Sequence, residues 1–214
     1  MTKMIKMAVV LFVFLLNFSA DQENTKQTTN WATVREAFEA YCKSPSADNA
    51  NKILAALPNN FSNREGDFDQ WVSAVNYVYK GQPFRVMDEL VRKGDKLALR
   101  VACKTLFMSD AAFGEDLCGL IGRAIRVNPR LFLEEIKLSS LDSDILGSIL
   151  AGNIDADEYR PEVVNKEIQL RIKSLKTVNR PDLLELRDVC IIKLKESLKY
   201  RGGGENHGTL SSRE

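Results

Sequence analysis

The chain has 214 residues, of which 44% are hydrophobic and 28% are charged, and its net charge is +1. This length suits one domain with a sizeable core or a short array of repeats. A charge so close to zero provides no field that would attract nucleic acid, so the sequence argues against nucleic-acid binding.

The N-terminal segment has the layout of a secretory signal peptide. Two lysines precede an apolar run from Met7 to Leu16, and Ala20 is followed by the polar sequence DQENTKQTTN. We therefore predict a signal peptide over residues 1–20 and a polar linker over residues 21–30. The apolar run is shorter than the roughly 20 residues that span a bilayer. We expect an extracytoplasmic protein, periplasmic or secreted, with no membrane span in the mature chain. An uncleaved anchor is the alternative, because bulky Phe18 lies three residues before a cut at Ala20.

The rest of the chain predicts helices only. Between residues 31 and 199, apolar residues recur at helical spacing, and no segment alternates apolar with polar residues as a strand does. Helical hairpins are expected to begin near Trp31, Asp67, Lys96, Asn128 and Pro161. Prolines stand where the first turn of a helix tolerates a missing N–H, at Pro83, Pro129, Pro161 and Pro181. We predict an all-α domain over residues 31–199 and a disordered, glycine-rich tail over residues 200–214.

The hairpins recur about every 30 to 35 residues, which is the spacing of stacked two-helix repeats. In this period, and in segments such as GDKLALRVACKTLF and NPRLFLEEI, the chain resembles α-solenoids of the HEAT or tetratricopeptide type. The diagnostic tetratricopeptide and ankyrin patterns are absent. The resemblance implies stacked antiparallel helical hairpins with a groove that binds another protein. A compact multi-helix bundle is the other architecture that fits the pattern.

Four cysteines give two candidate disulfides in an exported chain. Cys103 and Cys118 flank the central turn at similar distances, so two antiparallel helices would bring them to the same height. Cys42 and Cys190 lie on the first and last hairpins and would meet only in a compact bundle. Buried free thiols are the alternative for all four residues, since unpaired cysteine is among the most buried residue types.

Candidates for catalysis are few. The only histidine, His207, lies in the predicted tail, so histidine-based catalysis and zinc binding have no ordered histidine to use. Residues 153–158 match the start of a calcium loop but lack its glycine and its final glutamate, and a helix-capping loop is the expected reading. No cofactor motif occurs, and we predict no cofactor. Carboxylates suited to hydrolysis would have to come from Glu115, Asp116, Glu134 and Glu135.

Candidate interaction residues lie in the first half of the domain. Phe61 and Arg64 belong to the irregular loop from Pro58 to Asp67, and Tyr77 falls off the apolar stripe of its helix. We expect an exported, non-enzymatic scaffold that binds another protein in the cell envelope. The alternatives are a carboxylate-dependent envelope hydrolase and a small inhibitor or stress protein stiffened by disulfides.

Overall fold

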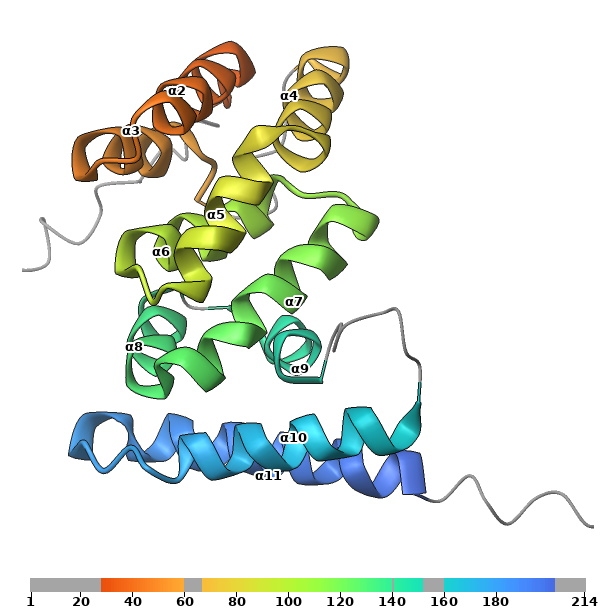
Figure 1. The fold of residues 1–214 in the computed structure, drawn as a ribbon. Helices are drawn as coiled ribbons and strands as arrows, with labels where there is room; N and C mark the ends of the chain where they lie inside the picture. Colours follow the sequence, from red (N-terminus) through yellow and green to blue (C-terminus); the bar gives the residue numbers. More distant parts are fainter. Residues whose placement is uncertain (1–27, 60–66, 140, 152–159, 203–214) are drawn as a thin grey trace, which may run out of the picture.

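A computed structural model describes residues 28–59, 67–139, 141–151 and 160–202 (Figure 1). The protein is all-α, as predicted, and the described residues contain no strand. The predicted signal peptide, Phe61, Arg64, the calcium-like segment and His207 all lie outside the described residues. None of the helices in the described ranges is both long enough and apolar enough to cross a membrane.

The helices pair into five successive hairpins. The first two hairpins are α2 (Trp31–Lys43) with α3 (Ala47–Ala56), and α4 (Phe68–Lys80) with α5 (Gln82–Arg92). The third joins α6 (Lys96–Thr105) through the 3₁₀ turn η2 (Leu106–Met108) to α7 (Ala111–Val127). The last two are α8 (Pro129–Ser139) with α9 (Ser143–Ala151), and α10 (Pro161–Leu175) with η3 (Pro181–Leu183) and α11 (Leu184–Gly202).

Local sequence sets where these helices begin. Asp95 accepts a hydrogen bond from the backbone N–H of Ala98 at 2.8 Å, and Asp110 accepts one from Phe113 at the same distance. Such caps satisfy backbone donors that have no partner within the helix. The four prolines predicted to open helices each lie in the first turn of α5, α8, α10 or η3, which confirms that prediction.

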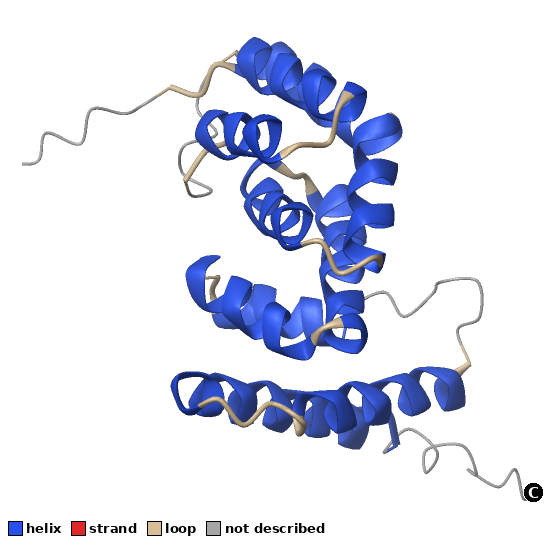
Figure 2. Ribbon diagram, turned by 60° about the vertical axis from the view of Figure 1, so that its left-hand side comes forward, coloured by secondary structure: helices blue, strands red, loops and turns tan. Residues whose placement is uncertain are grey.

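The hairpins stack into an array, with α2 and α3 at one end and α10 and α11 at the other (Figure 1). One row is formed by α5, α7, α9 and α11, each packed against the next, and α3, α6 and α8 form a second row beside it. A second view shows the α10–α11 hairpin closing the end of the array remote from the first hairpin (Figure 2). The buried apolar side chains of all five hairpins join in one core.

All four cysteines are free thiols, so the predicted disulfides are not formed in the structure. Cys103 lines a pocket bounded by α3, α6 and α8, whereas Cys118 lines a different pocket between α7 and α9. Cys42 and Cys190 lie on helices at opposite ends of the array. Three of the free thiols are buried, those of Cys103, Cys118 and Cys190. The fourth, that of Cys42, is half-buried.

A close helix contact lies where α7, α9 and α10 meet. Arg171 of α10 is only 1% exposed. Its Nη1 donates to the carbonyl oxygens of Leu150 at 2.8 Å and Ile149 at 3.3 Å, at the C-terminal end of α9. Gly122 of α7 lies against the same carbonyl of Ile149 and against the Arg171 guanidinium. Arg171 therefore satisfies backbone acceptors that α9 leaves without an intrahelical partner.

Candidate binding groove

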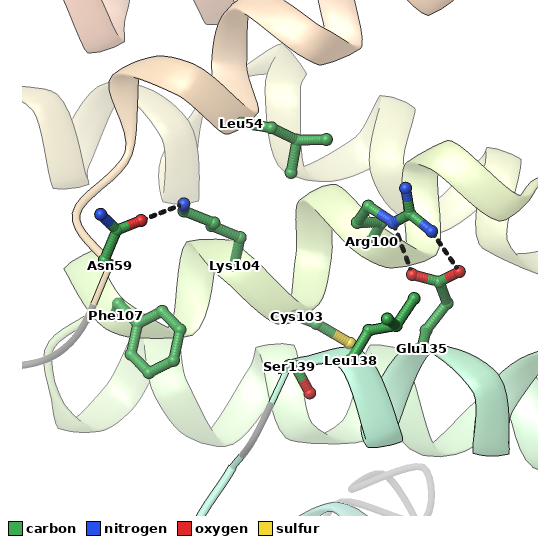
Figure 3. Close-up of a pocket in the computed structure, with 9 residues that line it drawn as sticks. All are labelled: Leu54, Asn59, Arg100, Cys103, Lys104, Phe107, Glu135, Leu138 and Ser139. Carbon is green, nitrogen blue, oxygen red and sulfur yellow. Dashed lines mark hydrogen bonds and ion pairs between the residues drawn. The ribbon is translucent and has the colours of Figure 1, made fainter. Parts of the chain in front are cut away.

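Three helices from three different hairpins enclose a pocket of about 410 Å³, which we call the α6 groove (Figure 3). Its lining comes from the end of the first hairpin, from one face of α6 and η2, and from α8. The lining residues are Leu54, Asn59, Arg100, Cys103, Lys104, Phe107, Glu135, Leu138 and Ser139. This volume lies within the range of roughly 300 to 1,000 Å³ typical of ligand pockets.

Helical spacing brings the central lining residues together. Arg100, Cys103, Lys104 and Phe107 are separated by three or four positions, so they share one face of the helix and the turn that continues it. Opposite them, Leu138 near the end of α8 is 65% exposed although it borders the groove. Together with Leu54 and Phe107, it gives the groove apolar walls beside two basic side chains.

A bidentate ion pair joins α6 to α8 at one side of the groove (Figure 3). Arg100 donates from Nε to Glu135 Oε2 at 2.7 Å and from Nη2 to Oε1 at 2.9 Å. The Glu135 side chain is 1% exposed, and a carboxylate so buried needs a charged partner. Because Nε and Nη2 are used in this pair, Nη1 of Arg100 is the nitrogen with no dashed contact in Figure 3.

Lys104 is the second cation of the groove. Its Nζ donates to Oδ1 of Asn59 at 2.6 Å, and this partner is a neutral amide. Burial lowers the pKa of the Lys104 amine, because the protein removes water without placing a carboxylate beside the charge. The residues that line the groove thus carry two positive charges against the single negative charge of Glu135.

The thiol at the base of the groove is suited to packing and not to reaction. Cys103 is 2% exposed, and burial raises its thiol pKa far above the ordinary value. Nucleophilic cysteines have the opposite property, a lowered pKa in a partly exposed, electropositive setting.

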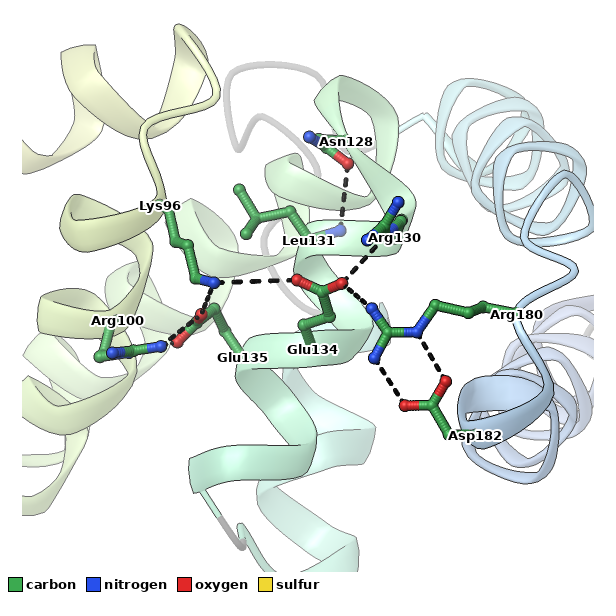
Figure 4. Close-up of polar contacts among 9 residues, drawn as sticks. All are labelled: Lys96, Arg100, Asn128, Arg130, Leu131, Glu134, Glu135, Arg180 and Asp182. Atoms are coloured by element: carbon green, nitrogen blue, oxygen red, sulfur yellow. Dashed lines mark hydrogen bonds and ion pairs between the residues drawn. The ribbon is translucent and has the colours of Figure 1, made fainter.

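Three of the four carboxylates considered for hydrolysis are engaged by other side chains. Asp116 accepts a hydrogen bond from the hydroxyl of Tyr79 at 2.7 Å. Glu134 is held by Arg130 and Arg180, and Lys96 lies 3.9 Å from it (Figure 4). The hydrogen bond from Arg130 lowers the pKa of Glu134, which opposes a role as a general acid.

Of the other two carboxylates, Glu135 belongs to the ion pair with Arg100. Glu115 lines a separate pocket of about 300 Å³ between α7 and α9. Asp110 lines the same pocket, but its carboxylate caps α7. Among the described residues, no group of histidine, cysteine, aspartate and glutamate side chains is arranged to hold a metal ion.

The interaction residue that can be located, Tyr77, contacts its own chain. It is half-buried and packs against the core, and the Arg35 guanidinium of α2 lies 5.0 Å above its ring centroid. Tyr77 therefore joins α2 to α4 and has one ring face covered by Arg35. Phe61 and Arg64 cannot be placed, since they lie outside the described ranges.

Sequence reasoning missed the groove itself. Its signal in the sequence is the pair Arg100 and Lys104, which with Lys96 places a basic residue at every fourth position of a largely apolar helix. Leu138 gave no signal, because only the stacking of α8 beside α6 shows which face it borders.

Comparisons with known protein families, with curated proteins and with solved structures found no match to this chain. The case for a function therefore rests on the geometry of the groove and on the N-terminal sequence.

Proposed function

We propose that this protein is an exported, non-enzymatic scaffold that binds a segment of another protein in the α6 groove, in the cell envelope. The observation that carries the proposal is the groove itself, where three hairpins together form a cavity that places apolar side chains beside two basic ones. Stacked helical arrays use such inter-repeat surfaces to bind extended partners. The exposed Leu138 supplies apolar surface that a partner would cover.

Export is the second part of the proposal and is supported by sequence alone. The basic start, the apolar run and the polar segment after Ala20 match a secretory leader. The N-terminal residue of the protein purified from the envelope, determined by mass spectrometry, should lie close to Asp21. Intact Met1 in the cytoplasmic fraction would contradict export.

Neither alternative function gains support from the described residues. The hydrolase hypothesis needs facing carboxylates free to exchange protons, whereas Glu134 and Glu135 are held in ion pairs with arginines. The inhibitor hypothesis relied on disulfides, and the four cysteines are free.

A groove-dependent capture experiment tests the proposed binding. Envelope extract is passed over the immobilised full-length protein, its Leu138→Ser variant and its Ile192→Ser variant. Ile192 is a matched control, because it is a similarly exposed aliphatic residue on α11 and does not line the groove. We expect a protein that the wild type and the Ile192 variant retain equally and the Leu138 variant loses. Equal retention by all three proteins would refute binding in this groove.

A further inference from the structure

The two cations of the α6 groove stand one helical turn apart on the same face. Side chains at positions i and i+4 have Cβ atoms about 5 to 6 Å apart, but the charged groups diverge, with Lys104 directed to Asn59 and Arg100 directed to Glu135 (Figure 3). Each cation therefore offers a separate contact point for a carboxylate, and both retain donors. The ammonium of Lys104 has three N–H donors, one of which donates to Asn59. Arg100 donates from Nε and Nη2 to Glu135.

The groove is short. Its lining on α6 and η2 runs from Arg100 to Phe107, which is about 10 Å at 1.5 Å per residue. An extended peptide advances about 3.3 Å per residue, so about three residues occupy this length. A chain end enters such a cavity from one side, whereas an internal segment must both enter and leave it.

Apolar walls lie beside the cations. Leu54, Phe107 and Leu138 line the same cavity as Arg100 and Lys104, and Figure 3 shows Lys104 between Leu54 and Phe107. At the C-terminus of a protein, the carboxylate and the last side chain belong to one residue. A C-terminal aliphatic residue can therefore place its carboxylate on a cation and its side chain on the apolar wall at the same time.

We infer that the α6 groove recognises the free C-terminus of its partner, with the terminal carboxylate bound to Lys104 and an aliphatic last side chain against Leu54, Phe107 and Leu138. This inference rests on the proposed function and names the part of the partner that is bound. Charge complementarity supports it, since the groove has one more cation than it has anions. The lowered pKa of Lys104 agrees with a cation that gains from an added carboxylate.

The test uses three small probes and the full-length chain in isothermal titration. The probes are acetyl-Ala-Ala-Leu with a free carboxylate, the same peptide as its C-terminal amide, and hexanoate. We expect the free acid to bind at least tenfold more tightly than the amide. Equal binding of acid and amide, or no binding of the acid at millimolar concentration, overturns the inference. Hexanoate binding as tightly as the peptide also overturns it, because the groove would then recognise a free alkyl carboxylate.

Variants locate the binding. Lys104→Gln should weaken binding of the free acid at least tenfold and leave the amide nearly unchanged. Lys93→Gln removes the same charge from an exposed position at the end of α5 and should leave both affinities unchanged. An equal loss of affinity for the free acid in the two variants would show general electrostatic attraction and refute the site. Circular dichroism confirms that each variant retains its helix content.

The two proposals fail differently. A captured protein that depends on Leu138, together with equal binding of acid and amide, would refute recognition of a C-terminus and leave the scaffold function standing. Absence of any Leu138-dependent partner would refute the scaffold function, even if the tripeptide acid binds.

Discussion

At the scale of single residues, Arg171 shows how a charge can be part of the core. The side chain is 1% exposed and lies among α7, α9 and α10, with its guanidinium on the last carbonyls of α9 and 3.3 Å from Glu167. The C-terminal end of a helix carries partial negative charge and carbonyl groups without an intrahelical donor. A cation there is attracted by the charge and donates hydrogen bonds to these carbonyls.

Arg171→Met should destabilise the protein by about 2 to 3 kcal/mol. The methionine fills much of the volume but leaves the carbonyls of Ile149 and Leu150 buried without a donor, and an unsatisfied buried polar group costs roughly 1 to 3 kcal/mol. Urea denaturation of both proteins measures the change. Lys173→Met, at an exposed position of the same helix, is the control and should change stability by less than about 0.5 kcal/mol. Equal stabilities for Arg171→Met and Lys173→Met would show that the buried contacts contribute nothing.

At the scale of the helices, packing distance decides which small residues the array requires. A Cβ added at Gly122 of α7 would lie 2.5 Å from the carbonyl oxygen of Ile149 and 2.9 Å from Nη1 of Arg171. The first of these atoms is backbone and cannot move without shifting α9. A Cβ added at Gly147, within α9, would meet nothing within 4 Å. The two glycines therefore differ in role although both lie inside helices.

Replacement of each glycine by alanine should change stability in opposite directions. Gly122→Ala forces α7 and α9 apart and should cost about 1 to 3 kcal/mol. Gly147→Ala should stabilise the protein by about 0.5 to 1 kcal/mol, because alanine loses less conformational freedom in a helix. Thermal unfolding of the two variants beside the wild type gives the comparison. A stabilising Gly122→Ala substitution would contradict the close approach of α7 and α9.

Ion pairs connect α8 to the start of the last hairpin (Figure 4). Arg180 contacts Glu134 of α8 and pairs with Asp182 through two hydrogen bonds of 2.6 Å. Hydrogen bonds from Arg130 to Glu134 and from Arg180 to Asp182 lower the pKa of each carboxyl below its ordinary value of 4.5 or 3.8. Since both pKa values are lower in the folded protein, these carboxylates stabilise it above pH 4.5, and the stabilisation is lost as the pH falls below that value.

Arg180→Gln should therefore destabilise the protein more at pH 6 than at pH 2. At pH 6 both carboxylates are ionised and lose a partner, whereas near pH 2 protonation has already removed part of the interaction in the wild type. Urea midpoints at the two pH values provide the measurement. Lys199→Gln, an exposed lysine of α11, serves as the control and should leave the pH dependence unchanged. A difference between wild type and Arg180→Gln that stays constant from pH 6 to pH 2 would contradict the coupling.

At the scale of the whole molecule, the sequence predicts the helices well and their mutual placement poorly. Helix positions follow from local features, such as the apolar spacing after Asp95 and the prolines that open α8 and α10. The groove depends on α3, α6 and α8, which are distant in sequence and meet only after the hairpins stack. The burial of Arg171 and the exposure of Leu138 have the same origin. Neither residue type predicts its own environment, because that environment is supplied by another hairpin.

Stacking into an open array also determines the state of the cysteines. Cys42 and Cys190 lie at opposite ends, and no bridge joins any of the four cysteines in the structure, so we expect four free thiols. Burial raises the pKa of Cys118 to about 11 and that of Cys190 to about 12, which leaves little thiolate at pH 8.

Iodoacetamide at pH 8 should label the native protein slowly and should label half-buried Cys42 first. In denaturant it should add four labels without any reductant, as counted by intact mass. Cys42→Ser should remove the earliest native label and leave three labels in denaturant. A requirement for reductant before the third and fourth labels appear would reveal a disulfide. Such a bridge between Cys42 and Cys190 would demand a closed bundle in place of the array, because only a closed arrangement brings the first and last hairpins within bonding distance.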